Sequence, residues 1–370
     1  MSTIAHAPEN TGGNGPASEP SAATGAVSRT DRTVNPGRFK RLIRSNGALV
    51  IAAVVVVILA VISTFVGVAD VTPATLIRQV AGGDTAGLQE SLHLLSVSRF
   101  PRTISVILAG MAMAVAGLIM QQMARNKFVE PSTVGTVESA SLGLLAVTVL
   151  IPSAPLLGKM GVAAVFAVGG TALFLAVLQK IPLRNALLVP LVGIMLGNVI
   201  AAITTFFAYR FNLLQTLNTW MIGDFSGVIK GRYELLWIVA ALTLIGYIAA
   251  DRFTVAGMGQ DVSTTLGVNY KRIMALGMTI VALISAVVVV TIGSIPFLGL
   301  VVPNIVSLMI GDNMRRSVPW VGVFGAGFVL VCDIVGRVIR YPFEIPVGTV
   351  VAVVGAAIFL AMLLRKRARS

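Results

Sequence analysis

The feature that most limits how this chain can fold is a series of ten apolar runs with few charges. They occupy residues 48–69, 103–123, 134–151, 160–178, 186–208, 235–250, 273–292, 297–310, 318–335 and 346–364. Lipid offers no partner for an unpaired backbone amide, and a helix needs about 20 apolar residues to cross a bilayer. Only 12% of the residues are charged, about half the usual share of a soluble domain. The sequence therefore predicts an all-α, polytopic membrane protein with about ten transmembrane helices.

The first 46 residues differ from the rest of the chain. They are rich in Gly, Ser, Thr, Ala, Asn and Pro and have no apolar periodicity, which predicts a disordered tail. The run 48–69 follows a basic cluster, as a secretory signal would. It is longer than the 7 to 15 residues of a signal core, and no clear cleavage site follows it. We expect a disordered cytoplasmic tail over 1–46 and a transmembrane domain over 47–370.

The basic residues predict the orientation. With the tail inside and ten crossings, 19 of the 28 Lys and Arg residues fall on the cytoplasmic side. This asymmetry agrees with the positive-inside rule and places both termini in the cytoplasm of a multi-pass cell-membrane protein. The net charge of +13 is spread over loops rather than gathered on one face, so it does not indicate nucleic-acid binding.

The chain offers little chemistry of its own. Its nearest approach to a phosphate-binding loop, at Lys159, lacks the required glycine spacing and hydroxyl. One cysteine, Cys332, and two histidines, His6 and His93, leave almost no material for a metal site or for the base of an intramembrane protease. We expect no catalytic residue, no metal and no cofactor. Transport is the leading function.

Two polar segments are expected to lie outside the lipid bilayer. Arg99 and Arg102 flank a proline before the second run, where they either contact an acidic partner or anchor to lipid headgroups. The loop 251–272 predicts a short surface helix from Asp261 to Leu266, with glycines on both sides as breakers. This loop either meets a cytoplasmic partner or simply connects two spans.

Acidic residues within spans are functional candidates because an unpaired charge in hydrocarbon is costly. Asp333 and Arg337 stand four residues apart, so a local helix pair is the interpretation we favour. Glu138 has no such partner. Three roles are open for it: it lines the transport pathway, it forms a hydrogen bond to another helix, or it relays protons. Pro303 predicts a broken or tilted helix in the short run 297–310.

Glycines recur at spacings of three, four or seven residues and predict close helix packing. They are Gly110 and Gly117, Gly193 and Gly197, and Gly322 and Gly325.

Four stretches, in order, resemble the FecCD family of ABC-importer permeases, which move ferric siderophores, haem and vitamin B12. They are Arg99-Phe-Pro-Arg102, GLIMQQMARNKFVEP from Gly117, GSIPFLGLVVPN from Gly293, and DIVGRVIRYPFEIPVG from Asp333. Lys127-Phe128 replaces the common Pro-Leu, and Asn304 and Asn313 replace common histidines. The stretch Lys127-Phe-Val-Glu-Pro-Ser-Thr-Val-Gly135, together with Gly223-Asp-Phe-Ser226 and Tyr270-Lys-Arg272, is similar to the branch serving catecholate-type siderophores such as petrobactin and anguibactin.

The resemblance implies a type II ABC importer permease fold and a set of partners: a cytoplasmic ABC ATPase dimer, an extracytoplasmic substrate-binding protein, and a second permease chain, with a heterodimer favoured and a homodimer possible. ATP hydrolysis would belong to the ATPase, and the cargo would be a ferric siderophore.

The resemblance also assigns roles to single residues. Docking of the binding protein falls to Arg99, Arg102 and Arg337. Coupling to the ATPase falls to Gly259, Asp261, Leu266 and Gly267. The translocation path is expected along the fifth span, at Asn198, Thr204 and Thr205. Glu138 is a further candidate for the path because it is an acid within a span.

A proton-coupled secondary transporter of a small polar solute is the alternative. It would need no ATPase and would depend on Glu138.

Overall fold

The computed structural model describes residues 46–67, 71–180 and 188–367, and the regular elements of these ranges are helices. In chain order they are α2 (Asn46–Phe65), α3 (Pro73–Gly82), α4 (Thr85–Leu94), the π-helical turn η1 (Leu95–Arg99), α5 (Phe100–Met123), η2 (Pro131–Thr133), α6 (Thr136–Leu150), α7 (Leu156–Gln179), α8 (Leu188–Arg210), α9 (Leu214–Met221), η3 (Tyr233–Leu236), α10 (Trp237–Ile248), α11 (Ala250–Gly257), α12 (Gln260–Thr265), α13 (Tyr270–Thr291), α14 (Leu298–Ile310), α15 (Met314–Val338) and α16 (Val347–Arg367). The predicted disordered tail, apart from Asn46, lies outside the described residues.

Each of the ten apolar runs corresponds to one helix. In the described part of the chain, seven are long and apolar enough to cross a bilayer. The helical stretch 233–248, joined to α11 at a bend of 62°, supplies an eighth, and α6 and α14 are shorter apolar helices. The prediction of an all-α membrane fold is confirmed.

The second span is longer than its apolar run. Helical structure continues from Thr85 to Met123, over 39 residues, through the π-helical turn η1. The sequence placed the start of this span at Thr103. Pro101 does not end the helix there, because the Val97 carbonyl, which proline cannot reach with an N–H, accepts instead from the backbone N–H of Lys230 (3.0 Å).

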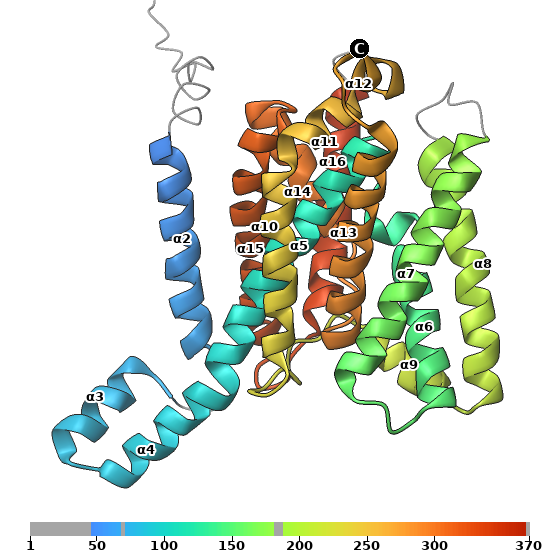
Figure 1. Cartoon of the computed structure of the whole chain (residues 1–370). Coiled ribbons are helices and arrows are strands. Elements are labelled where there is room, and N and C mark those ends of the chain that lie inside the picture. The colour runs from blue at the N-terminus through green and yellow to red at the C-terminus, as the bar shows by residue number, and fades with distance from the viewer. Residues whose placement is uncertain (1–45, 68–70, 181–187, 368–370) are drawn as a thin grey trace, which may run out of the picture.

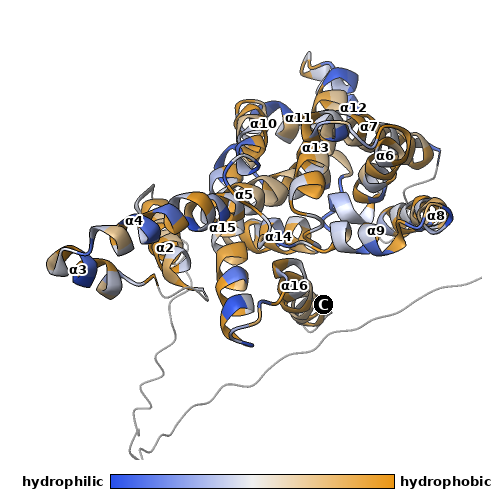
Figure 2. Ribbon diagram, turned by 90° about the horizontal axis from the view of Figure 1, so that it is seen from below, coloured by the Kyte–Doolittle hydropathy of each residue, from blue (hydrophilic) through white to orange (hydrophobic). Residues whose placement is uncertain are grey.

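Helix α5 forms the centre of the bundle. It packs against α15, α13, α14 and α10, and most of its residues are buried (Figures 1 and 2). Helices α2 and α8 lie at opposite margins and expose many apolar side chains. Such faces are stable only against lipid or another apolar protein surface.

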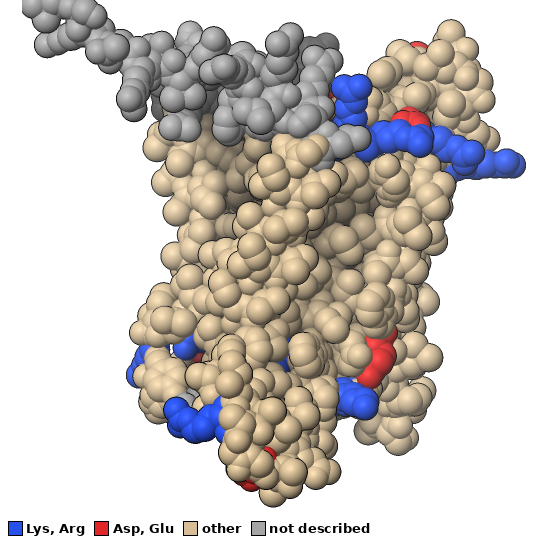
Figure 3. All heavy atoms as spheres, turned by 90° about the vertical axis from the view of Figure 1, so that its left-hand side faces the viewer, with Lys and Arg blue, Asp and Glu red and all other residues tan. Residues whose placement is uncertain are grey.

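The bundle has two different ends. Helices α11 and α12 and the last residues of α16 lie at one end, called here the α12 end; α3, α4 and α9 lie at the other, the α3 end (Figure 1). On the side seen in Figure 3, Lys and Arg gather at both ends, with a broad band of uncharged residues between them. This distribution fits a protein that spans a bilayer.

The glycines lie where helices touch, as predicted. A Cβ at Gly110 would stand 2.7 Å from the carbonyl oxygen of Gly325, and one at Gly193 would stand 2.2 Å from that of Thr133. Small residues thus bring α5 to α15 and α8 to η2 at backbone distance.

Candidate functional site

A close backbone contact between helices joins two of the motif stretches, at Gly117 of α5 and Gly299 of α14. A Cβ at Gly117 would lie 2.0 Å from the Gly299 carbonyl oxygen. Only glycine permits this approach, so α14 is held against α5 by direct backbone contact.

The same contact explains how Pro303 is accommodated. In a regular helix the N–H of residue 303 would bond to the carbonyl of Gly299, but proline has no N–H. Gln121 Nε2 donates instead to the carbonyl oxygens of Gly299 (3.3 Å) and Leu300 (3.5 Å). A side chain of α5 therefore satisfies the backbone that proline leaves open. The helix is short, as expected, and remains continuous.

Glu130 holds the beginning of α14. Its carboxylate is buried and accepts from the backbone N–H of Phe297 (3.0 Å) and from the Ser132 hydroxyl (2.6 Å). Phe297 adopts a left-handed conformation with φ of 63°. An acid at a helix N-terminus is favourable, so Glu130 fixes the turn that leads into α14. Sequence reasoning did not select Glu130, although it stands within a quoted motif.

Lys127 ties the same stretch to the α12 end. Its ammonium group donates to the Ser307 hydroxyl (2.8 Å) and to both oxygens of Asp312 (2.9 and 3.0 Å). Burial acts to raise the pKa of Asp312, but the hydrogen bonds from Lys127 and Ser307 outweigh it, and the pKa lies below its ordinary value. Asn304 completes the junction by donating to the backbone carbonyl of Lys127 (2.7 Å).

A buried network of charged groups lies toward the α3 end. Arg102 donates to Asp333 (2.9 Å) and to Glu344 (2.6 Å), and Arg337 pairs with Asp333 on its own helix. The predicted Asp333–Arg337 helix pair is therefore confirmed. Arg337 also donates to the Ser63 carbonyl (2.8 Å), so the network joins α2, α5, α15 and the segment before α16.

The three arginines expected to dock a partner differ in exposure. Arg102 and Arg337 are only 7% and 3% exposed. Arg99 is half-buried and donates to the carbonyl of Val66 (2.7 Å). The structure thus brings the three together but directs two of them inward. Sequence reasoning missed Glu344, whose signal was the Glu-x-Pro-x-Gly ending.

Helix α12 forms the tip of the α12 end. It spans Gln260–Thr265, close to the predicted Asp261–Leu266, between Gly259 (φ 114°) and Gly267 (φ 73°). Asp261 is exposed. Val262 and Leu266 are also exposed and stand four residues apart, so they form an apolar stripe, called here the α12 stripe.

The residues expected along the translocation path lie on two different sides of α8. Asn198 and Thr205 are exposed and stand seven residues apart on one face of α8. Thr204 is buried, and its hydroxyl donates to the Ile200 carbonyl (2.8 Å). Glu138 faces the inner side of α8 at Gly197, and its Oε2 has no hydrogen-bond partner among the described residues. Within those same residues, no cluster of three His, Cys, Asp or Glu side chains could hold a metal ion.

Comparison with known proteins identifies the family. Residues 55–365 match the model of the FecCD transport family. The chain is 48% identical to a petrobactin import system permease protein, YclN, of Bacillus subtilis over 85% of this chain and 97% of that protein. It is 42% identical to the petrobactin permease FatD of Bacillus anthracis, over 92% and 98% of the two chains. It is also 42% identical to the ferric-anguibactin permease FatD of Vibrio anguillarum, over 72% and 85%.

Solved structures share the fold at lower identity. A metal-chelate type ABC transporter in an inward-facing conformation matches with a TM-score of 0.71 and 21% identity, over 87% of this chain and all of that one. PsaBC from Streptococcus pneumoniae matches with a TM-score of 0.55 and 15% identity, over 78% of this chain and 95% of that one. The family model and the relatives agree with the motif stretches that meet at α5 and α14, and the chain belongs to the FecCD transport family.

Proposed function

We propose that this chain is the membrane-spanning permease subunit of an ABC importer that carries a ferric siderophore of the petrobactin or anguibactin type into the cell. The observation that carries the proposal is the 48% identity to a petrobactin permease over 97% of that protein. The chain itself performs no covalent chemistry. ATP hydrolysis belongs to a separate ATPase dimer, and the siderophore keeps its iron throughout.

The α12 end faces the cytoplasm in this proposal, and the α12 stripe meets the ATPase. Exposed apolar side chains such as Val262 and Leu266 are unfavourable in water and are typical of a surface that a partner covers. Gly259 and Gly267 set the ends of α12, and Asp261 lies beside the stripe. ATP-driven closure of the ATPases would move α12 and the bent pair α10–α11 with it.

The α3 end faces outward and receives the substrate-binding protein. Arg99, Arg102 and Arg337 carry three positive charges, and Asp333 and Glu344 carry two negative ones. One positive charge is left over, and Arg99 is the most accessible of the three arginines. An acidic patch on the binding protein would complement this surplus, whereas Arg102 and Arg337 hold the surrounding segments in place.

The path lies along the exposed face of α8, which carries Asn198 and Thr205, and is closed by a second permease chain. A different partner chain is favoured over a second copy of this one, because Lys127-Phe128 stands in place of the common Pro-Leu, which is typical of one specialised half of a pair. Thr204 and Glu138 support this face from behind, through the packing of α6 on α8.

The function is tested by uptake into proteoliposomes that contain this chain, its partner permease, the ATPase and the binding protein. Ferric petrobactin and ferric anguibactin are the cargo probes. We expect uptake that requires ATP on the ATPase side and persists when an uncoupler is added. Uptake that an uncoupler abolishes while ATP is held constant would refute the proposal and support a proton-coupled transporter.

The docking role has its own test. Arg99→Gln should weaken association with the binding protein severalfold, and Arg78→Gln, on the exposed surface of α3, serves as the matched control. Equal association of both variants would remove Arg99 from the docking surface.

A further inference from the structure

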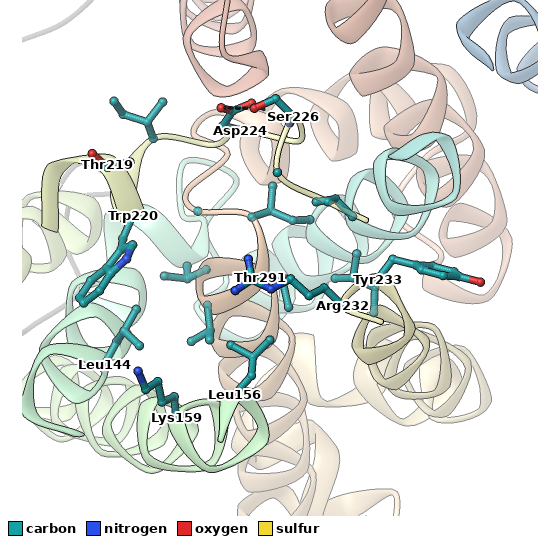
Figure 4. A pocket seen from close by; sticks show the side chains of 18 residues that line it. Leu144, Leu156, Lys159, Thr219, Trp220, Asp224, Ser226, Arg232, Tyr233 and Thr291 are labelled. Carbon is teal, nitrogen blue, oxygen red and sulfur yellow. Dashed lines mark hydrogen bonds between the residues drawn. The ribbon is translucent and has the colours of Figure 1, made fainter. Parts of the chain in front are cut away.

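A cavity of about 360 Å³ opens at the α3 end, away from the exposed face of α8 that carries Asn198 and Thr205. It lies between the facing ends of α6 and α7, the segment from α9 to η3, and the last turn of α13 (Figure 4). Its volume is in the usual range for a small-molecule site. None of the docking, coupling or path residues lines it.

The walls of the cavity are pinned before any ligand arrives. The backbone N–H of Asp224 donates to the carbonyl of Ile292 (3.0 Å), and that of Ser294 donates to Met221 (3.4 Å). Gly293 has φ of 102°, and a Cβ there would lie 2.5 Å from the Ile222 carbonyl oxygen. The segment 221–224 is therefore fixed against the end of α13, and binding would not need to order it.

Two cations enter the cavity from different elements. In Figure 4 the Lys159 side chain reaches toward Trp220 and Leu144, and the Arg232 side chain reaches toward Thr291. Neither forms an ion pair with any residue that the structure describes. The one acid of the lining is Asp224, whose oxygens already accept from the N–H and the hydroxyl of Ser226 (2.8 and 2.7 Å). The cavity therefore holds a surplus of positive charge.

Three hydroxyl groups of the lining, those of Thr219, Ser226 and Thr291, specify a second property of the ligand. The Thr291 hydroxyl donates to the Val287 carbonyl (2.6 Å), the Thr219 hydroxyl to Gln215 (3.0 Å), and the Ser226 hydroxyl to Asp224. A hydroxyl has one proton, so these oxygens have only lone pairs left to offer. They suit a ligand that brings hydroxyl donors in addition to its negative charge.

The apolar part of the lining specifies the third property. Trp220 lies with Leu144 and Leu156 on the Lys159 side of the cavity (Figure 4). An aromatic side chain beside aliphatic ones favours a flat ring. We propose that this cavity binds a small hydroxylated aromatic carboxylate: the carboxylate contacts Lys159 and Arg232, the ring packs against Trp220, and the phenolic hydroxyl donates its single proton to one of the threonine or serine oxygens. The site belongs to this chain alone and does not depend on the proposed cargo.

The test uses the purified full-length chain in nanodiscs of zwitterionic lipid, with radiolabelled para-hydroxybenzoate as the probe and para-hydroxybenzamide as its neutral match. We expect saturable binding of the carboxylate and binding of the amide that is at least about fivefold weaker. Lys159→Gln and Arg232→Gln should each weaken binding about threefold, as for partly exposed charge pairs. Lys230→Gln, an exposed neighbour outside the lining, should change nothing.

A second readout locates the probe. Binding should change the tryptophan fluorescence of the native chain but not that of Trp220→Phe, which keeps an aromatic ring and the remaining two tryptophans. Equal affinity for the amide, an equal loss in Lys230→Gln, or a fluorescence change that survives in Trp220→Phe would each overturn the proposal. Failure of uptake in the proteoliposomes would leave these results unaffected, so the two proposals are tested separately.

Discussion

Replacing Gly117 with alanine should separate α5 from α14. The added Cβ would lie 2.0 Å from the Gly299 carbonyl oxygen and 2.3 Å from its Cα, and both are backbone atoms that cannot rotate away. An ordinary contact needs about 3.4 Å, so the two helices must move apart by roughly 1.4 Å. Overpacking of a core costs about 1 to 3 kcal/mol, and backbone atoms place this site at the upper limit.

The separation has a second cost. The Gln121 hydrogen bond to Gly299 is already 3.3 Å long, and it would be lost if the helices moved apart. The Gly299 carbonyl would then have no donor, because residue 303 is proline. A buried unpaired carbonyl costs about 1 to 3 kcal/mol more. We therefore expect Gly117→Ala to lower the free energy of unfolding by about 4 to 6 kcal/mol in total.

The single cysteine provides the assay. Cys332 lies on α15, which packs against α5, and it is 2% exposed, so a thiol reagent labels it only when the bundle opens. We expect labelling of Gly117→Ala at a markedly lower temperature than labelling of the native chain. Gly169→Ala is the matched control, because its Cβ meets no atom within 4 Å and alanine favours a helix. Equal labelling curves for the two variants would refute the reasoning.

Three further outcomes are expected. Gln121→Leu should destabilise the bundle in the same labelling assay by about 1 to 3 kcal/mol. Adding Pro303→Ala should recover part of this loss, because alanine restores a backbone N–H for the Gly299 carbonyl. If the effects of the two substitutions on stability simply add, Gln121 does not compensate for Pro303. Leu266→Ser should weaken co-purification of the ATPase without shifting the labelling temperature, and unchanged co-purification would exclude the α12 stripe. The pKa of Asp312 is lower in the folded protein, so the stabilisation that Lys127 provides should be complete above about pH 4 and should be lost as the pH falls through the lowered pKa. This stabilisation should be below about 1 kcal/mol, because both side chains of the pair are about half exposed. A difference in denaturant midpoint between the native chain and Lys127→Met that persists at lower pH would contradict this.

The spans were predictable because a backbone segment in the bilayer must satisfy its own hydrogen bonds, which a helix does. Every apolar run became a helix, and the paired glycines marked real crossings such as Gly110 on Gly325. The start of the second span was not predictable in the same way. Hydropathy falls near residue 100, but helical structure continues through η1, because hydrogen bonding along the backbone does not depend on whether the side chains face lipid.

Local spacing predicted some contacts of the site and could not predict others. Asp333 and Arg337 are four residues apart, so their pairing follows from helix geometry. Arg102 and Glu344 are 242 residues apart, and their contact depends on how α5 meets the segment before α16. The role of Gln121 likewise required knowing that α14 brings a proline-exposed carbonyl against α5.

The charged network shows why residue type alone does not settle the role of an arginine near a membrane boundary. Removing one partner from a buried charge pair costs about 3 to 5 kcal/mol, and Asp333, with no exposed surface, pairs with two arginines. A docking partner that displaced Asp333 would have to replace both contacts. Binding to the unneutralised charge near Arg99 leaves every internal pair intact, and it is therefore the less costly way for an acidic surface to engage this end of the molecule.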